Sequence, residues 1–223
     1  MKYRCLILDH DDTAVDSTAE IHHPAHVEVM KQLRPGQEPA SLDEWFRKNF
    51  NPGIMVYLKE ELGFNEEEIQ IEYGIWREFT LNKTPHFFPG FLDLVREFKN
   101  RGGIVTVVSH SEREMIQRHY EMTEEPGREA LIPDSIFGWT MVPEERKPHP
   151  FPVHCILEEF NLSPEDVLVV DDLKPGVDMA KAADVAVAAA GWSHQIPEIV
   201  HFMKKNCHVY CSSIGELGEY LFN

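Results

Sequence analysis

The sequence predicts an α/β fold in which a Rossmann-like, doubly wound parallel sheet carries an inserted α-helical cap domain. Short apolar runs alternate with amphipathic helical patterns over most of the 223 residues, which is typical of parallel strands joined by right-handed crossovers. The alternation is interrupted once, over residues 17–85, where the hydrophobic period stays helical. We therefore expect a core domain from residues 1–16 and 86–223, with residues 17–85 as the helical cap.

The first expected elements follow from hydrophobic period and local stop signals. The apolar run at residues 5–8 has the length of a short buried strand. Four helices are expected in the inserted block. Pro35 stops the first helix, Ser41 begins a capping box for the second, Gly63 ends the third, and Asn65 caps the fourth.

The rest of the chain alternates between helix and strand patterns from residue 89 onward. The expected helices cover residues 91–98, 112–120, 153–160, 177–183, 196–204 and 213–221. The expected strands cover residues 104–108, 136–137, 167–170, 185–189 and 208–210. In such a parallel sheet, ligands bind beyond the carboxyl ends of the strands.

The composition limits the partners that this chain can have. With 21 Lys and Arg against 38 Asp and Glu, the formal net charge is −17, and no basic stripe exists to displace counterions from a nucleic acid. No apolar stretch approaches the roughly 18 residues of a membrane span, and the start carries no secretory signal. We expect neither a nucleic-acid nor a membrane partner, and the oligomeric state stays open.

The cysteines indicate a reducing environment. Cys5, Cys155, Cys207 and Cys211 are too dispersed for a disulfide framework, so we expect reduced thiols and a cytoplasmic location. A structural zinc site at the last two is disfavoured because no second pair of ligands has suitable spacing.

The most informative segment is Asp9-His10-Asp11-Asp12-Thr13, directly after the first expected strand. Buried strands rarely end in several carboxylates, because each ion is costly to desolvate unless a partner compensates its charge. Mg²⁺ is such a partner, since it prefers carboxylate and carbonyl oxygens. The segment indicates a metal site at the carboxyl edge of the sheet, although a solvated acidic turn would fit this pair of aspartates equally well.

Three further motifs decide between these alternatives. Ser109 follows the strand at 104–108, Lys147 precedes a proline, and Asp171 and Asp172 follow the strand at 167–170. Together with the first segment, this ordered set resembles the haloacid dehalogenase superfamily, in the helical-cap subgroup of phosphoglycolate phosphatases and β-phosphoglucomutase. The resemblance covers nearly the whole chain and implies a Mg²⁺-dependent phosphohydrolase acting on a small phosphorylated metabolite.

The resemblance implies roles for the residues near the first two strands. Asp9 would be the nucleophile that forms an aspartyl-phosphate, and Asp11 would protonate the leaving group and later activate water. Thr13 occupies the family's loop position in the phosphate-binding part of the site. The Ser109 hydroxyl and the main-chain N–H of His110 would hold phosphoryl oxygens.

The same resemblance assigns the later motifs. Lys147 would balance the charge of the aspartyl-phosphate, although most lysines in proline-rich turns are simply solvated. Asp9, the main-chain carbonyl of Asp11, and Asp172 would bind Mg²⁺, with Asp171 close behind, either directly or through water.

Two features depart from the family pattern. His10 replaces an apolar residue, and Asp12 replaces a glycine, which adds a carboxylate and removes a flexible position. Separately, His22, His23 and His26 are clustered, but Pro24 lies between them, so a hydrated or substrate-facing surface is favoured over a zinc site.

The favoured function is therefore phosphomonoester hydrolysis. The main alternative is a sugar phosphomutase, which would also keep Asp11, and a catalytically silent binding protein of the same fold is a third reading. Dehalogenation is disfavoured because relatives with that activity lack the second aspartate. The sequence does not identify the substrate.

Overall fold

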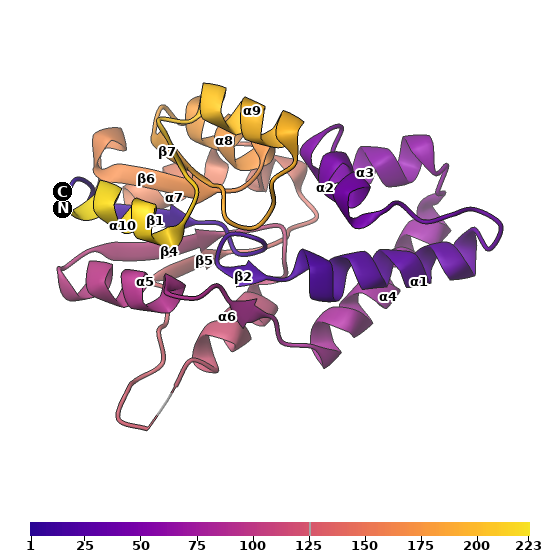
Figure 1. Cartoon of the computed structure of the whole chain (residues 1–223), viewed down its shortest axis with the longest axis horizontal. Coiled ribbons are helices and arrows are strands. Elements are labelled where there is room, and N and C mark those ends of the chain that lie inside the picture. The colour runs from indigo at the N-terminus through magenta and orange to yellow at the C-terminus, as the bar shows by residue number, and fades with distance from the viewer. Residues whose placement is uncertain (125) are drawn as a thin grey trace. The chain divides into compact units, whose positions relative to one another are not determined.

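The computed structural model describes residues 1–124 and 126–223, which form two compact units. The first unit consists of Met1–Val15 and Phe87–Asn223, and the second of Asp16–His86 (Figure 1). The roles of catalytic core and cap for these units stay predictions. Over the part of the chain that the structure describes, none of the helices combines the length and the hydropathy of a membrane-spanning segment.

The first unit is built on a six-stranded parallel sheet with strand order β5-β4-β1-β6-β7-β8. Its strands are β1 (Cys5–Leu8), β4 (Ile104–Val108), β5 (Ser135–Phe137), β6 (Val167–Asp171), β7 (Ala186–Ala190) and β8 (Val209–Cys211). The central strands β1 and β6 are buried at every residue, which explains their continuous apolar character. Two short strands, β2 (Val15–Asp16) and β3 (His86–Phe87), form a separate two-stranded sheet.

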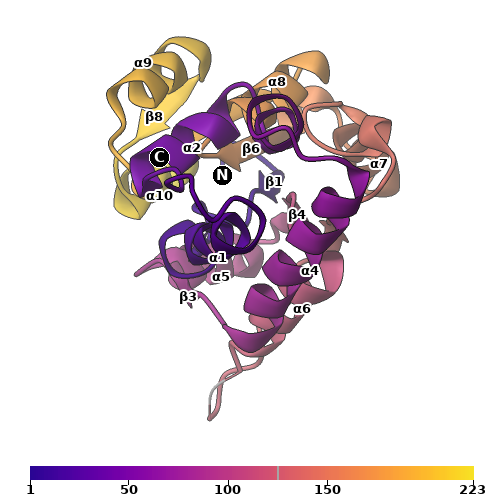
Figure 2. The ribbon, with the colours of Figure 1, turned by 90° about the vertical axis from the view of Figure 1, so that its right-hand side faces the viewer.

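Helices cover both faces of the six-stranded sheet, as both views of the ribbon show (Figures 1 and 2). One face carries α5 (Phe91–Asn100), α6 (Arg113–Glu121) and α10 (Ile214–Phe222), and the other carries α7 (Phe151–Glu159), α8 (Lys174–Ala182) and α9 (Pro197–Asn206). The first group packs one apolar core against the strands, in which Phe91, Phe98 and Ile116 are fully buried. The doubly wound α/β fold predicted from the sequence is confirmed.

The sheet register brings the chemically important strand ends to one edge. Leu8 pairs with Val107 of β4 and with Val170 of β6, so the residues that follow these three strands emerge side by side. Asp9 stays tied to this edge because its amide donates to the Val170 carbonyl at 2.9 Å. The edge is the place where open α/β sheets bind their ligands.

The second unit is helical and forms its own core. Its α-helices are α1 (His23–Leu33), α2 (Leu42–Phe50), α3 (Ile54–Val56) and α4 (Glu66–Asn82), with π-helical segments at Thr18–His22 and Tyr57–Glu61. The two predicted capping signals act as expected, since Ser41 accepts from the Glu44 amide and Asn65 forms a full capping box with Glu68.

One element begins earlier than its sequence pattern indicates. We expected a turn before a helix at 177–183, but α8 already begins at Lys174. Pro175 is compatible with this start, because the first-turn amides of a helix have no partner within the helix. Gly176 also allows it, since a Cβ atom there would lie 2.0 Å from Asp171 Oδ2.

Candidate active site

The candidate site is centred on Lys147, whose side chain is buried between two carboxylates. Its Nζ lies 2.8 Å from Asp9 Oδ1 and 2.8 Å from Asp171 Oδ2. The exposed fractions of these three side chains are 4%, 8% and 2%. Lys147 is therefore not a solvated surface lysine, and its ammonium group compensates the charge of Asp9 and Asp171.

Both carboxylates are further fixed by main-chain amides. The His10 amide donates to Asp9 Oδ1 at 2.7 Å, and the Leu173 amide donates to Asp171 Oδ1 at 3.0 Å. Burial alone would lower the pKa of Lys147, but the charges of Asp171 and Asp9 outweigh it and hold that pKa above its usual range. Lys147 is therefore positively charged at neutral pH.

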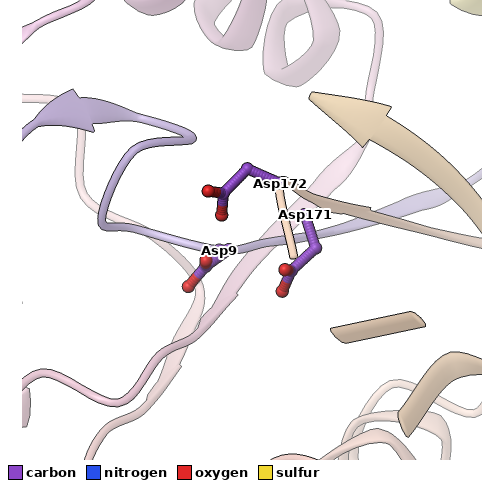
Figure 3. Close-up of side chains that lie close together, drawn as sticks. All are labelled: Asp9, Asp171 and Asp172. Carbon is purple, nitrogen blue, oxygen red and sulfur yellow. The ribbon is translucent and has the colours of Figure 1, made fainter. Parts of the chain in front are cut away.

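Asp172 completes a group of three carboxylates whose oxygens lie within 4.8 Å of one another (Figure 3). Thr13 Oγ1 donates to Asp172 Oδ1 at 3.5 Å, and His194 Nε2 lies 3.5 Å from Oδ2. Trp192 supports this arrangement, because its indole N–H donates to the Thr13 carbonyl at 3.0 Å.

The electrostatics of this group fit a hard divalent cation. Burial, and next the charge of Asp171, raise the pKa values of both Asp9 and Asp172 well above the usual value. Lys147 brings one positive charge to three buried carboxyl groups, so a further cation is needed for all three to be ionised together. A cluster of this kind has the donor set and the charge that Mg²⁺ requires.

Asp11 is held by two serine hydroxyls from the segment that follows β4. Ser109 Oγ and Ser111 Oγ donate to Asp11 Oδ2 at 3.2 Å and 2.6 Å. The amide of Ser111 in turn donates to Ser109 Oγ at 3.1 Å. The structure thus brings the predicted acid/base residue together with the predicted phosphate-binding serine.

His110 acts through its side chain as well as its main chain. Its Nε2 lies 3.0 Å from the Lys147 carbonyl, which makes the ring nitrogen the donor and ties the loop after β4 to the loop that carries Lys147. Burial, followed by the charge of Lys147, lowers the pKa of His110 to about 4. The neutral ring leaves the positive charge of the site on Lys147.

Sequence reasoning missed three contributors. Ser111 lies only two residues beyond Ser109, and the Ser-His-Ser run was the available signal. His194 follows the carboxyl end of β7, so its place beyond a strand end could have been noted. The Asp171–Lys147 contact joins residues 24 apart, and the sequence carries no signal for such a pairing.

His10 is explained by packing. It is fully buried, and its Nε2 lies 3.0 Å from Nδ1 of His119 on α6, with the two rings stacked. Tyr120 lies beside them with a ring-centroid distance of 5.7 Å to His10. The polar residue in the middle of the first motif therefore faces the helix layer, where an apolar residue would otherwise pack.

The three clustered histidines of the second unit contact different partners. His22 accepts a hydrogen bond from the Trp76 indole, and His23 contacts the Ala40 carbonyl. His26 is 3% exposed and stacks on Trp45 at a centroid distance of 4.3 Å, so the expected hydrated surface is wrong for this residue. Among the described residues, the carboxylates of Asp9, Asp171 and Asp172 are the group close enough to share a metal ion.

Comparison with known families identifies the family of the chain. The model of the haloacid dehalogenase-like hydrolases matches residues 3–184. The chain belongs to this family. The predictions of the family and of a hydrolase fold are therefore confirmed, and the match includes every predicted site residue from Asp9 to Asp172.

Curated relatives and solved structures extend over almost the whole chain. A phosphoglycolate phosphatase from Aquifex aeolicus is 25% identical over 207 residues, which cover 87% of this chain and 90% of the relative. A putative haloacid dehalogenase-like hydrolase from Bacteroides fragilis has a TM-score of 0.78 at 18% identity, covering 97% of this chain and 100% of the other. CbbY from Rhodobacter sphaeroides, solved with phosphate, has a TM-score of 0.73 at 21% identity, with coverage of 97% and 96%.

Proposed function

We propose that this chain is a Mg²⁺-dependent phosphomonoester hydrolase that acts on a small phosphorylated metabolite through an aspartyl-phosphate. The observation that carries the proposal is the contact of Lys147 with both Asp9 and Asp171 at the carboxyl edge of the sheet. It combines an oxygen nucleophile, a fixed cation and a carboxylate cluster in one buried place. Phosphoryl transfer needs these parts, because it depends on positioning and on neutralising charge.

The proposed reaction has two steps. Asp9 attacks the phosphorus atom, the bond from phosphorus to the leaving oxygen breaks, and Asp11 donates a proton to that oxygen. Water then attacks the phosphorus of phospho-Asp9 while Asp11 accepts its proton, which releases inorganic phosphate and restores the Asp9 carboxylate. The Ser109 hydroxyl and the His110 amide bind phosphoryl oxygens in both steps.

The metal belongs beside the nucleophile. The carboxylates of Asp9 and Asp172, with the main-chain carbonyl of Asp11, would hold Mg²⁺, which supplies Lewis-acid neutralisation of the phosphoryl oxygens. Each oxygen of Asp171 already accepts a hydrogen bond, so we assign to it the positioning of Lys147. Thr13 supports Asp172 through its hydroxyl.

Two kinds of relative suggest where to look for the substrate. The curated relatives are phosphoglycolate phosphatases at 24–25% identity, and a mutant of CbbY was solved in complex with xylulose-(1,5)bisphosphate. We therefore propose a small phosphorylated carboxylate or sugar. The net charge of −17 means that Lys147 and the main-chain donors must attract the anion locally. The four cysteines lie unpaired, as the proposed cytoplasmic location requires.

The test is a phosphate-release assay over a panel of phosphomonoesters that includes 2-phosphoglycolate and xylulose 1,5-bisphosphate. We expect phosphate release with Mg²⁺, no phosphate release after chelation, and recovery of phosphate release when Mg²⁺ is added back. Asp9→Asn is the control for contaminating phosphatases, since it keeps the side-chain size and removes the nucleophile. Release that persists in Asp9→Asn or in excess chelator would contradict the proposal.

A further inference from the structure

The serine pair around Asp11 carries an inference that deepens the proposed function and rests on it. Two hydroxyls, from Ser109 and Ser111, converge on one oxygen of Asp11, its Oδ2. All three residues belong to the first unit, and both serines are buried, with exposed fractions of 2% and 6%. The Ser111 contact is the shorter of the two, at 2.6 Å against 3.2 Å.

We propose that Ser111 is the positioning residue for the acid/base Asp11, and that phosphate binding transfers the Ser109 hydroxyl from Asp11 to the substrate. A hydroxyl has a single hydrogen to donate. Ser109 cannot give it to Asp11 Oδ2 and to a phosphoryl oxygen at once. When substrate binds Ser109, the Ser111 hydroxyl still donates to Asp11 Oδ2.

The backbone of Ser111 is fixed through both its amide and its carbonyl group. Its amide donates to Ser109 Oγ at 3.1 Å, and its carbonyl accepts from the Trp139 amide at 2.8 Å. Gly138 lets the neighbouring backbone approach closely, because a Cβ atom there would lie 2.8 Å from the Ser111 carbonyl oxygen and 2.4 Å from the Arg113 amide. The hydroxyl of Ser111 is thus presented from a rigid backbone.

The contact has a chemical consequence for proton transfer. Because Oδ2 accepts from the serines, these contacts set the orientation in which Asp11 presents its carboxyl group to a leaving group. A terminal carboxyl torsion is soft, so the Ser111 contact narrows the range of orientations that the Asp11 carboxyl group can adopt. Loss of this orientation should slow only those reactions in which the leaving group needs a proton.

The experiment compares Ser111→Ala with the wild type on phenyl phosphate and 4-nitrophenyl phosphate, which have similar shapes and differ in leaving-group basicity. We expect kcat on phenyl phosphate to fall about 10- to 100-fold, as for other small misplacements of a catalytic group. On 4-nitrophenyl phosphate, whose leaving group needs little protonation, the loss should be no more than about threefold. KM should change little on either substrate.

Two further variants separate positioning from a general loss of structure. Ser111→Thr keeps the hydroxyl and should restore most of the phenyl phosphate rate. In an Asp11→Asn background, Ser111→Ala should cause no further selective loss, because the group that it positions is gone. Thermal unfolding of each variant, followed by circular dichroism, verifies that the fold is retained.

The outcomes are distinguishable. Equal losses on the two substrates, or a failure of Ser111→Thr to restore the rate, would overturn the role of Ser111 while the hydrolase assignment stands. An additive effect in the Asp11→Asn background would do the same. A wild-type chain that releases phosphate from neither substrate nor from the metabolite panel would overturn the proposed function, and this inference with it.

Discussion

Replacing Lys147 by methionine is the perturbation whose effect follows most directly from the structure. The substitution keeps the length and the apolar stem of the side chain but removes the charge that contacts Asp9 and Asp171 at 2.8 Å each. Removing one partner of a buried ion pair costs about 3–5 kcal/mol, because the remaining charge stays buried without compensation. For a chain of this size, that loss lowers the melting temperature by roughly 10 °C.

The assay is thermal unfolding in chelator and in Mg²⁺ at pH 8. In chelator we expect the full loss of stability. In Mg²⁺ the difference in melting temperature between the wild type and Lys147→Met should become smaller. A ligand of the native state at a hundred times its Kd adds about 2.7 kcal/mol of stability, and the variant has more uncompensated negative charge with which to bind Mg²⁺. Phosphate release should fall by roughly 10²–10³-fold, as expected when a preorganised charge is lost from a transition state.

Two controls make the result specific. Lys205→Met removes an exposed lysine and should change the free energy of unfolding by less than about 0.5 kcal/mol. Adding Asp171→Asn to Lys147→Met should recover part of the lost stability, because one of the uncompensated carboxylates is then neutral. If Lys147→Met is as stable as the wild type in chelator, the account of a buried bridging lysine is refuted.

The remaining predictions concern packing, pH dependence and product. Gly176→Ala should lower the free energy of unfolding by about 1–3 kcal/mol, because the added methyl group overpacks against Asp171. Gly74→Ala should raise it by about 0.5–1 kcal/mol, because Gly74 has open space around it in α4. Chemical denaturation measures both changes. Burial, and next the charge of His23, lower the pKa of His26 to about 4, so the unfolded chain binds this proton more readily and stability should fall as the pH drops from 6.5 to 4. The stability of His26→Gln should depend less on pH over this window, and the two chains should differ by at most about 3 kcal/mol in the change of their unfolding free energy. The same pH dependence in both chains would contradict this prediction. With a sugar 1-phosphate and a trace of the 1,6-bisphosphate, phosphorus NMR should show inorganic phosphate; accumulation of the 6-phosphate alone would favour a mutase.

The fold could be predicted from the sequence because its signals are local. Buried parallel strands are continuous apolar runs, and the capping residues Ser41 and Asn65 mark helix starts within a few positions of themselves. The sequence also predicts that Asp9, Ser109 and Asp171 lie at the carboxyl ends of strands. Asp9 and Ser109 directly follow their strands, and Asp171 is the last residue of its own.

The missed features depend on contacts between distant segments. Asp11 meets Ser111 across 100 residues, and His10 meets His119 across 109. Hydrophobic periodicity assigns a residue to a face of its own element, but it does not say which side chain of another element lies opposite. His26 shows the same limit, because its burial results from stacking on Trp45 of another helix.

The departure from the family pattern at Asp12 has a physical reading in the structure. Its backbone lies in the left-handed region, at φ 58°, which glycine adopts without strain and which aspartate tolerates better than most residues. The position therefore keeps the conformation that a glycine would provide, and the first motif retains its turn, with the Asp12 amide donating to the Val15 carbonyl at 2.8 Å.

The central claim, that Asp9 carries the phosphoryl group, is tested most directly by trapping the intermediate. The enzyme is mixed with the best substrate of the panel in Mg²⁺, quenched in acid during turnover, and reduced with borohydride, which converts an aspartyl-phosphate to homoserine. Peptide mass spectrometry should then find homoserine at position 9 in the wild type and none in Asp9→Asn. An unmodified Asp9 under conditions of verified turnover, or a phosphoryl group on Ser109, would contradict the account.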